Sequence, residues 1–258
     1  MSKSYLVRPL IFGALLVFLL NYGGRIALLL FTRWEVRDSP QVWLVPTPLA
    51  VVPPDRHAGR KFSYFGYDFE TPWIELTSER RMDANDNSNS AVNLTFSTGN
   101  VVMIFDPAKQ DSLQILKQEA SKRGEQLRRY FDDQALRTNY SMRSKELYLT
   151  PHDMNVFSPR LEEAGNYSLI IMKSVELRRV KGGLYSFQTK RLRGFQQGNP
   201  GQDEVVMVEA YDSQDHLIKL FIASDRAGQH KVSQADINQI VCSLRLTIDA
   251  STSASLDR

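Results

Sequence analysis

The sequence predicts an α+β fold, an antiparallel sheet flanked by helices in an α-β-α sandwich-like arrangement, preceded by one N-terminal transmembrane helix. Three observations predict it: a long apolar segment close to the N-terminus, pairs of β-rich segments separated by turn residues, and capping residues in front of amphipathic stretches. A length of 258 residues suits one such domain with accessory segments.

The composition favours a globular protein, because 42% of the residues are hydrophobic and 24% are charged. The net charge of +3 comes from the first 33 residues, which hold four basic residues and no acidic one. The remaining 225 residues carry 28 basic and 29 acidic side chains, so nucleic acid is not expected as a partner. With one cysteine, Cys242, the chain cannot form an internal disulfide.

Residues 10–31 follow a short tail, residues 1–9, and predict the transmembrane helix, because 22 residues at about 1.5 Å each match the hydrocarbon core of a bilayer. The alternative is a cleavable signal whose core is residues 10–20. Cleavage after Gly23 or Gly24 would put Asn21 or Tyr22 at the third position before the cut, where a small residue is required, and would leave an apolar end behind it. We therefore expect an uncleaved anchor in the lipid bilayer.

The orientation of the anchor follows from what flanks it, since Lys3 and Arg8 nearly balance Arg33 and Arg37 in the positive-inside count. A short tail before the anchor and a long domain after it favour an extracytoplasmic domain, on the periplasmic or lumenal side. Arg25 lies about 9 Å inside the far end of the helix, close enough for its side chain to reach the headgroups.

One face of the predicted anchor is small and polar, and suggests an integral membrane protein as a partner. Small residues let two membrane helices approach closely, and an amide can donate a hydrogen bond across the contact. The stripe, with Arg25 beside it, consists of Gly13, Val17, Asn21, Gly24 and Leu28. The alternative is an arginine tolerated just inside the interface, without a partner.

Residues 32–60 are predicted to form a proline-rich stalk, because they hold Pro40, Pro46, Pro48, Pro53 and Pro54. Trp34 suits the aromatic belt of a membrane interface. Part of the stalk, residues 43–45, is apolar enough to lie against the domain. The domain itself is predicted over residues 61–247 and is followed by an unstructured tail, residues 248–258.

The first half of the domain is predicted to combine strands with helices. Residues 62–73 are strand-like, and the segments 92–96 and 101–105 flank a four-residue hairpin turn. Asp111 is a candidate N-cap of a helix that extends to Tyr130. Two shorter helices are expected within residues 132–163, the second starting near Ser158.

The second half is predicted to contain two hairpins and a closing helix. Residues 167–180 and 184–195 are expected as strands joined by a Gly182-Gly183 turn, and residues 203–212 and 216–224 as strands joined across 213–215. Ser233 caps the closing helix. The apolar stripe of this helix is Ile237, Ile240, Val241 and Leu244.

This order of elements resembles the PsbP-like domain family over roughly residues 61–247. The similarity lies in the early "FGYDFETPW", the late hairpin "VVMVEAYDSQDHLIKLFIAS" and the closing "QADINQIVCSLR". The resemblance implies an α-β-α sandwich and an extracytoplasmic accessory or assembly role beside membrane complexes. This chain differs from the family in the predicted membrane helix and stalk that precede the domain, and no metal ligand of the family can be transferred to it.

No motif for catalysis, cofactor binding or metal binding is present in the sequence. There is no Gly-x-Ser-x-Gly, and His57, His152, His216 and His230 are far apart in the chain. Asp83, Asn85 and Asn87 match the first positions of an EF-hand loop, but its glycine and its bidentate glutamate are missing. We therefore expect no catalytic, cofactor or metal residues.

Basic residues, Lys173 among them, gather in the segment 173–193 against Glu176 alone, and suggest docking to anionic headgroups or an acidic partner. If Gly182-Gly183 is a hairpin turn, these charges lie together. The patch is Arg178, Arg179, Lys181, Lys190, Arg191 and Arg193. The alternative is a solvated hairpin whose charges protect a sheet edge from aggregation.

Together these features predict a single-pass, membrane-anchored, non-catalytic binding or assembly module that docks on a membrane protein complex or an anionic surface. Two alternatives stay open. One is an extracytoplasmic, hydrolase-like enzyme whose active-site residues converge only in the folded chain, and the other is a small-ligand or ion-binding domain.

Overall fold

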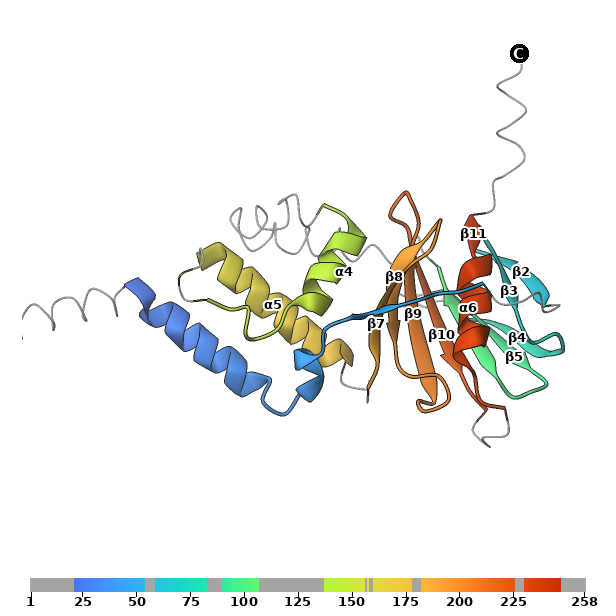
Figure 1. The fold of residues 1–258 in the computed structure, drawn as a ribbon, viewed down its shortest axis with the longest axis horizontal. Coiled ribbons are helices and arrows are strands. Elements are labelled where there is room, and N and C mark those ends of the chain that lie inside the picture. Colours follow the sequence, from blue (N-terminus) through green and yellow to red (C-terminus); the bar gives the residue numbers. More distant parts are fainter. Residues whose placement is uncertain are drawn as a thin grey trace, which may run out of the picture. The chain divides into compact units, whose positions relative to one another are not determined.

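A computed structural model describes residues 21–53, 59–82, 90–106, 137–155, 157, 160–177, 182–225 and 230–246 (Figure 1). The chain divides into two compact units. The helical unit contains residues up to Val45 together with the segment from Ser141 to Arg179, and the sheet unit contains the segment from Pro46 to Ile115, residues 138–140 and the chain from Val180 onwards.

The helical unit contains helix 21–35, the short 3-10 helix η1 (Pro40–Trp43), most of α4 (Asn139–Tyr148) and α5 (Arg160–Glu176). Its core consists of Val36, Val42, Leu149, Met154, Leu169 and Ile170. Leu28 and Leu29 of helix 21–35 pack against this core, so the helix is joined to α5 by apolar contacts.

The sheet unit is built on an eight-stranded mixed sheet with the order β1-β7-β8-β9-β10-β6-β5-β4. Among the described strands only β1 and β7 pair in parallel, and the other neighbours in this sheet are antiparallel. The strands are β1 (Thr47–Leu49), β4 (Leu76–Met82), β5 (Ala91–Phe96), β6 (Val101–Phe105), β7 (Leu184–Gln188), β8 (Arg193–Gln197), β9 (Val205–Tyr211) and β10 (Leu217–Ala223).

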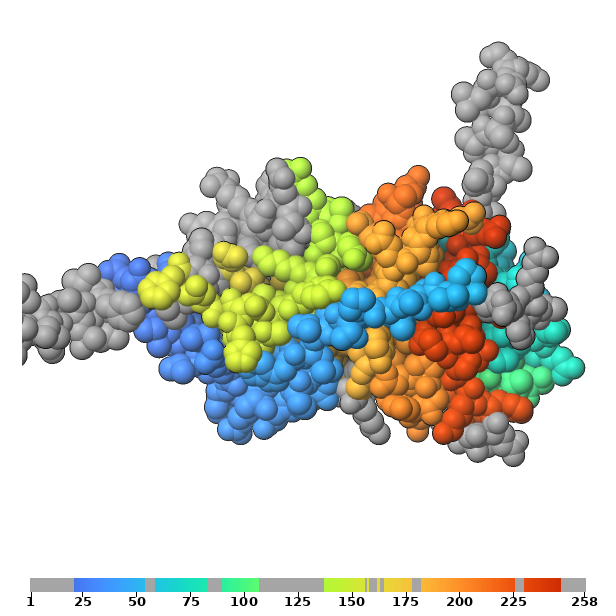
Figure 2. Space-filling model, in the orientation of Figure 1, coloured from blue at the N-terminus to red at the C-terminus, as the bar shows by residue number. Residues whose placement is uncertain are grey.

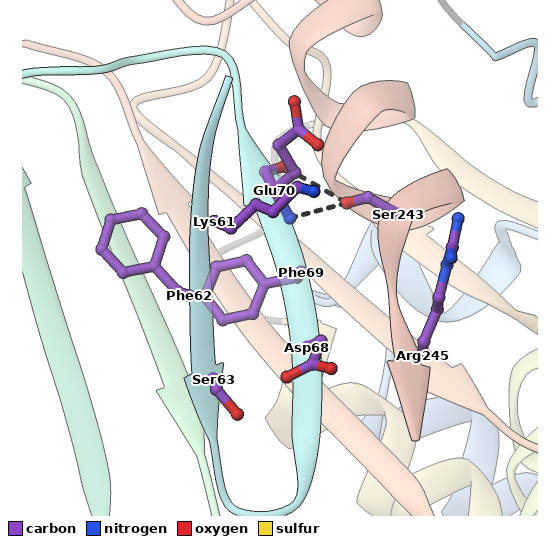
Figure 3. A pocket seen from close by; sticks show the side chains of 8 residues that line it. All are labelled: Lys61, Phe62, Ser63, Asp68, Phe69, Glu70, Ser243 and Arg245. Atoms are coloured by element: carbon purple, nitrogen blue, oxygen red, sulfur yellow. Dashed lines mark hydrogen bonds between the residues drawn. The ribbon is translucent and has the colours of Figure 1, made fainter. Parts of the chain in front are cut away.

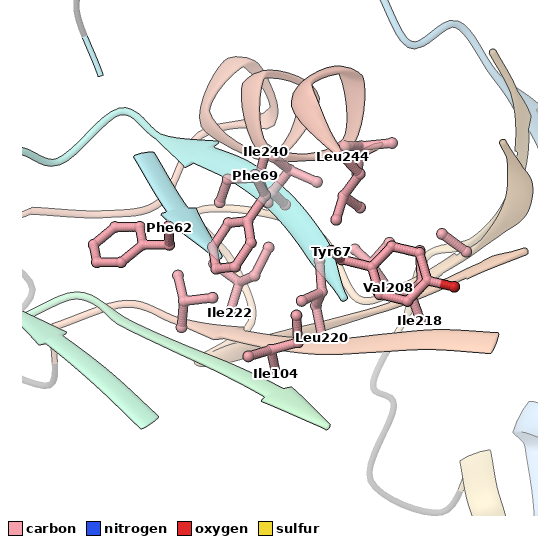
Figure 4. Packing of buried hydrophobic residues seen from close by; sticks show 14 of the residues in the cluster. Phe62, Tyr67, Phe69, Ile104, Val208, Ile218, Leu220, Ile222, Ile240 and Leu244 are labelled. Carbon is pink, nitrogen blue, oxygen red and sulfur yellow. The ribbon is translucent and has the colours of Figure 1, made fainter. Parts of the chain in front are cut away.

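A three-stranded sheet and one helix cover one face of the large sheet. The small sheet has the order β11-β3-β2, with β2 at Arg60–Tyr64, β3 at Tyr67–Thr71 and β11 at Arg245–Leu246. Figure 4 shows Phe62 and Phe69 of this sheet, with Ile240 of α6 (Gln234–Ser243), facing Leu220 and Ile222 of the large sheet. This apolar layer is the core of the sheet unit.

Local turn chemistry explains how the strands meet. Phe65 and Gly66 both have positive φ, 53° and 79°, which is the geometry of a two-residue type I′ hairpin between β2 and β3. Ser233 and Asp236 form a capping box at the start of α6, because each side chain accepts a hydrogen bond from the backbone N–H of the other residue. The stripe of α6 is buried as predicted.

The structure confirms the α+β class, the β5–β6 hairpin, the β9–β10 hairpin and α6. The sheet is mixed instead of antiparallel, because the predicted stalk contributes β1 parallel to β7. Residues 62–73 were expected as one strand and form the β2–β3 hairpin. The helix predicted between Asp111 and Tyr130 lies outside the described residues.

The strand predicted over residues 167–180 is wrong, since these residues continue α5 as far as Glu176. Leu169, Lys173 and Leu177 recur every four residues and are all fully buried, which is the pattern of one helix face. The Gly182-Gly183 turn is therefore wrong too. The hairpin turn in this region is at residues 189–192, where the Thr189 hydroxyl accepts a hydrogen bond from the backbone N–H of Leu192.

In the described part of the chain no helix combines the length and the apolar character needed to cross a membrane. The first half of the predicted anchor, residues 10–20, lies outside the described residues, and the second half is the start of helix 21–35.

Candidate functional site

Helix 21–35 presents two opposite apolar faces. At 100° per residue, Gly24, Ala27, Leu30, Phe31 and Trp34 fall within an arc of about 120°. All five are exposed, and Leu30, Phe31 and Trp34 are 60%, 47% and 57% exposed. We call this set the outer face; the helix that carries it is the dark blue segment in Figure 2.

The inner face of the same helix is buried in the helical unit. Leu28, Leu29, Thr32 and Val36 lie on the side opposite the outer face, and Val36 is fully buried in the core. The Thr32 hydroxyl donates a hydrogen bond of 2.7 Å to the carbonyl of Leu28, so its polar group is satisfied within the helix. The inner face alone would suffice to hold the helix on the unit, and the outer face needs another explanation.

Aromatic rings and arginines cluster at the end of the outer face. The ring centroids of Phe31 and Trp34 are 6.0 Å apart, and that of Tyr167 on α5 lies 6.2 Å from Phe31. The Arg37 guanidinium lies 5.7 Å from the centre of the Trp34 ring. Aromatic rings with arginines beside them are typical of protein surfaces at the level of lipid headgroups.

The helical unit also holds charged groups in its interior. Lys173 of α5 is 0% exposed, and its ammonium donates hydrogen bonds to the carbonyls of Leu44, Leu147 and Leu149 at 2.6, 2.7 and 2.9 Å. These three bonds join η1, the end of α4 and α5. Burial lowers the pKa of Lys173 from 10.5 to about 8, against the nearby carboxylate of Glu146, which raises it.

A buried ion pair lies beside this lysine. Arg143 contacts the carboxylate of Glu146 at 2.8 Å and that of Glu176 at 2.5 Å. The side chains of Arg143 and Glu146 are 5% and 1% exposed. Buried pairs of this kind are sensitive to the loss of one partner, which leaves the other charge uncompensated.

In the sheet unit, the β9–β10 turn brings together a carboxylate, an imidazole and a phenol. Asp212 accepts a hydrogen bond from the Tyr67 hydroxyl at 3.1 Å, and its carboxylate lies 3.0 Å from Nδ1 of His216. The side chain of His216 is 50% exposed. The hydrogen bonds from His216 and the backbone of Gln214 lower the pKa of Asp212 in spite of its burial.

The same turn positions the start of α4. The backbone N–H groups of Asn139 and Tyr140 donate to the carboxylate of Asp215, which therefore caps the helix. Arg193 lies 4.0 Å above the Tyr140 ring and 3.9 Å from Asp215. Arg193, predicted as part of the docking patch, is thus bound within the chain.

A pocket of about 430 Å³ lies on the small sheet of the sheet unit, as Figure 3 shows. Lys61, Asp68, Glu70 and Arg245 contribute charges of both signs to its lining. The backbone N–H of Glu70 donates to the Ser243 hydroxyl at 2.8 Å, which ties the end of α6 to β3. This lining joins elements of the fold, and its mixed charge favours no class of ligand.

The predicted partner face lies partly within the described residues. Asn21 and Gly24 are exposed, and Gly24 has open space where a Cβ would stand. Leu28 packs inward, and the Arg25 guanidinium lies 5.3 Å from the centre of the Tyr22 ring. Gly13 and Val17 lie outside the described residues, so the docking role of this face stays a prediction.

The prediction of the basic patch depended on a hairpin turn at Gly182-Gly183, and the structure has no turn of this kind there. Gly182 and Gly183 precede β7 and Lys190 follows it, so the two glycines do not form the turn of a hairpin. Lys190 and Arg191 are exposed at the turn. Arg178, Arg179 and Lys181 lie outside the described residues, and docking through this patch stays a prediction.

The remaining candidates from the sequence are single residues. His152 packs against Trp43, with ring centroids 4.7 Å apart. Burial raises the pKa of the Cys242 thiol, which makes it a poor nucleophile. No group of three or more metal-ligating side chains was found among the described residues, and the EF-hand-like segment 83–89 lies outside them.

No protein-family model, curated protein or solved structure matches this chain. The resemblance to the PsbP-like domain family therefore stays a prediction.

Sequence reasoning missed the buried Lys173 and the Asp212–His216 pair. It placed Lys173 in a predicted strand and in the basic cluster 173–193, because the three carbonyls that bind its ammonium come from other parts of the chain. Asp212 and His216 are four residues apart across a predicted turn, and that spacing was a usable signal.

Proposed function

We propose that this protein is a non-catalytic binding or assembly module that its N-terminal apolar segment holds at a membrane. Its α+β domain docks on a membrane protein complex or an anionic surface on the extracytoplasmic side. An α-β-α sandwich-like domain behind an N-terminal membrane anchor, and an integral membrane protein as partner, are parts of this proposal.

The observation that carries the proposal is the outer face of helix 21–35. Three large apolar side chains there are about half exposed, although the inner face of the helix is already packed. The eleven residues that precede the helix, 10–20, are almost purely apolar and lead directly into it. Lipid or a membrane-embedded partner would cover both.

Membrane attachment is tested with the full chain produced in a bacterial host. We expect it in the membrane fraction, and we expect it to stay there after an alkaline carbonate wash that removes peripheral proteins. Recovery of the chain in the soluble fraction before the wash would contradict the proposal.

The partner is tested by affinity purification of the full chain in mild detergent. Replacement of Asn21 and Gly24 by leucine should abolish co-purification of a membrane protein, because bulky side chains prevent close helix approach. The matched control is Ser213→Leu, which adds a leucine at an exposed turn of the sheet unit, outside both proposed docking surfaces. Equal recovery of the same partner with all variants would contradict the partner face.

The basic patch is tested separately with acidic vesicles. Reversal of Arg178, Arg179 and Arg191 to glutamate should weaken attachment of the domain to anionic lipid, with a loss of about 1 kcal/mol for each charge. Binding that is unchanged and independent of salt would refute a docking role for the patch.

An extracytoplasmic, hydrolase-like enzyme is the second candidate, and one observation favours it. The carboxylate of Asp212 lies 3.0 Å from Nδ1 of the half-exposed His216, an arrangement that favours the tautomer with the proton on Nδ1 and the lone pair on Nε2. Hydrolysis of chromogenic esters or phosphates by the full chain, lost in the His216→Asn variant, would favour the enzyme. We expect no difference between the two chains.

A further inference from the structure

We propose that helix 21–35 lies along the bilayer surface, with its outer face among the lipid headgroups and upper acyl chains, instead of continuing a helix that crosses the membrane. This inference rests on the membrane attachment of the proposed function and specifies how the described residues meet the lipid. It places residues 21–31, the second half of the predicted span, at the membrane surface instead of across the bilayer.

The first argument is the division of the helix into two faces. Leu28, Leu29 and Val36 pack into the core of the helical unit, and that side is closed to lipid. The opposite side carries Leu30, Phe31 and Trp34 in the open. A helix with one packed side and one open apolar side fits a position at the membrane surface, where a single side enters the headgroup and upper acyl region.

The second argument is the neighbour of the helix. Tyr22 contacts Phe157 with ring centroids 5.6 Å apart, and Phe31 contacts Tyr167 at 6.2 Å. The start of α5 therefore runs beside residues 22–31, and it carries the exposed Glu162 between these two contacts. If residues 22–31 crossed the bilayer, this carboxylate would lie at the depth of the hydrocarbon, at a cost of several kcal/mol.

The third argument identifies the occupant as lipid. Residues 10–20, which precede the helix in the sequence, are almost purely apolar, and eleven residues are fewer than a membrane span requires. Arg33 and Arg37 flank the aromatic end of the outer face, and Arg37 stacks on Trp34. Arginines beside half-exposed aromatic rings suit the phosphate layer that lies above the acyl chains.

The test compares the depths of two positions on the outer face. Gly24 and Trp34 are ten residues apart, or about 15 Å along the helix axis. Three full-length variants each keep one tryptophan: Trp34 alone, Gly24→Trp with the native tryptophans changed to phenylalanine, and Trp73 alone. Open space beside Gly24 makes room for the larger side chain. Each variant is reconstituted into phosphatidylcholine–phosphatidylglycerol vesicles with brominated lipids that quench either near the headgroups or near the bilayer centre.

The surface helix predicts that the tryptophans at positions 24 and 34 have the same depth, about 5–10 Å below the headgroup boundary, and that Trp73 is not quenched. A tryptophan at position 24 that lies about 15 Å deeper than Trp34 would show a spanning helix and overturn the inference. Vesicles that float with the protein while neither position is quenched would show that protein covers the outer face, and would overturn it too. Failure of the chain to float with vesicles would instead reject the membrane attachment on which the inference rests.

Discussion

The helical unit and the sheet unit distribute their side chains in opposite ways. The helical unit buries Arg143, Glu146 and Lys173, and every strongly exposed aromatic side chain among the described residues belongs to it. These aromatic residues are Phe31, Trp34, Trp43, Tyr148 and Phe157. The sheet unit has a continuous aliphatic and aromatic core, and its exposed large apolar residues are aliphatic and scattered.

The two units therefore differ in how they cover their apolar side chains. The sheet unit buries most of its large apolar side chains in its own core. The helical unit uses hydrogen-bonded charges as part of its interior and leaves apolar area outside, which is expected where lipid or protein completes the structure. The following experiments test the comparison, from the largest expected effect to the smallest.

Replacement of Lys173 by methionine should destabilise the helical unit by about 3 kcal/mol or more. Methionine fills a similar volume, but the carbonyls of Leu44, Leu147 and Leu149 lose their donor, and each unsatisfied buried group costs about 1–3 kcal/mol. Denaturant unfolding, followed by the fluorescence of Trp43 in the same unit, measures the change. The control is Lys190→Met at an exposed turn, which should shift stability by less than about 0.5 kcal/mol. Equal stability of the two variants would show that the buried ammonium does not hold the unit together.

Replacement of Gly194 by alanine should destabilise the sheet unit by about 1–3 kcal/mol. A Cβ at this position would stand 2.1 Å from the carbonyl oxygen of Glu209 and 2.8 Å from the Phe187 ring. Trp73 fluorescence during unfolding reports on this unit. Gly182→Ala is the matched control, because its Cβ would meet only the Asn199 amide at 3.4 Å. A sheet unit that tolerates both changes equally would contradict the close packing of β8 on β9.

Alkaline pH should affect the two units in opposite directions. Lys173 has a pKa of about 8 in the folded chain and an ordinary value of 10.5, so between these values the unfolded chain binds more protons. The free energy of unfolding of the helical unit should therefore rise with pH in this window, by at most about 1.4 kcal/mol per pH unit. Glu146, Asp153 and Arg143 are the charged groups that act on this lysine.

The sheet unit should instead lose stability above pH 10. Burial raises the pKa of Tyr64 to about 12 and also raises that of Tyr67, so the unfolded chain releases these protons first. The stability that depends on them is present below pH 10 and is lost as the pH rises toward 12. Parallel titrations followed by Trp43 and Trp73 fluorescence measure both units. The Lys173→Met variant should abolish the rise, and a rise that persists in this variant would assign it to another group.

Removal of the Ser233 cap should cost the sheet unit about 1 kcal/mol, the smallest of these effects. The Ser233→Ala variant loses the hydroxyl that accepts from the backbone N–H of Asp236. Ser213→Ala, at an exposed turn position, is the control. A cap variant as stable as the control would mean that packing alone positions α6.

Local chemistry made part of this fold predictable from the sequence. The turn residues between β5 and β6 and between β9 and β10 lie between apolar runs, and the Ser233 capping box lies directly before an amphipathic stretch. Each of these signals is complete within a few residues, so no distant part of the chain is needed to interpret it.

The α5 helix was not predictable in the same way. Its apolar run at residues 169–172 fits a strand as well as a helix, and the deciding residue, Lys173, is buried only because carbonyls from η1 and α4 surround it. The outer face of helix 21–35 was also not predictable from the sequence. The sequence shows an apolar segment there, and only the packing of Leu28 and Leu29 on α5 distinguishes its two sides.

Photolabelling of the unaltered chain tests most directly whether the helical unit meets lipid and the sheet unit does not. The full chain is reconstituted into vesicles that contain a lipid-soluble carbene precursor, irradiated, and mapped by peptide mass spectrometry. We expect the label on residues 26–37 and its absence from β9 and β10. Equal labelling of both segments, or labelling of β9 and β10 alone, would contradict the account.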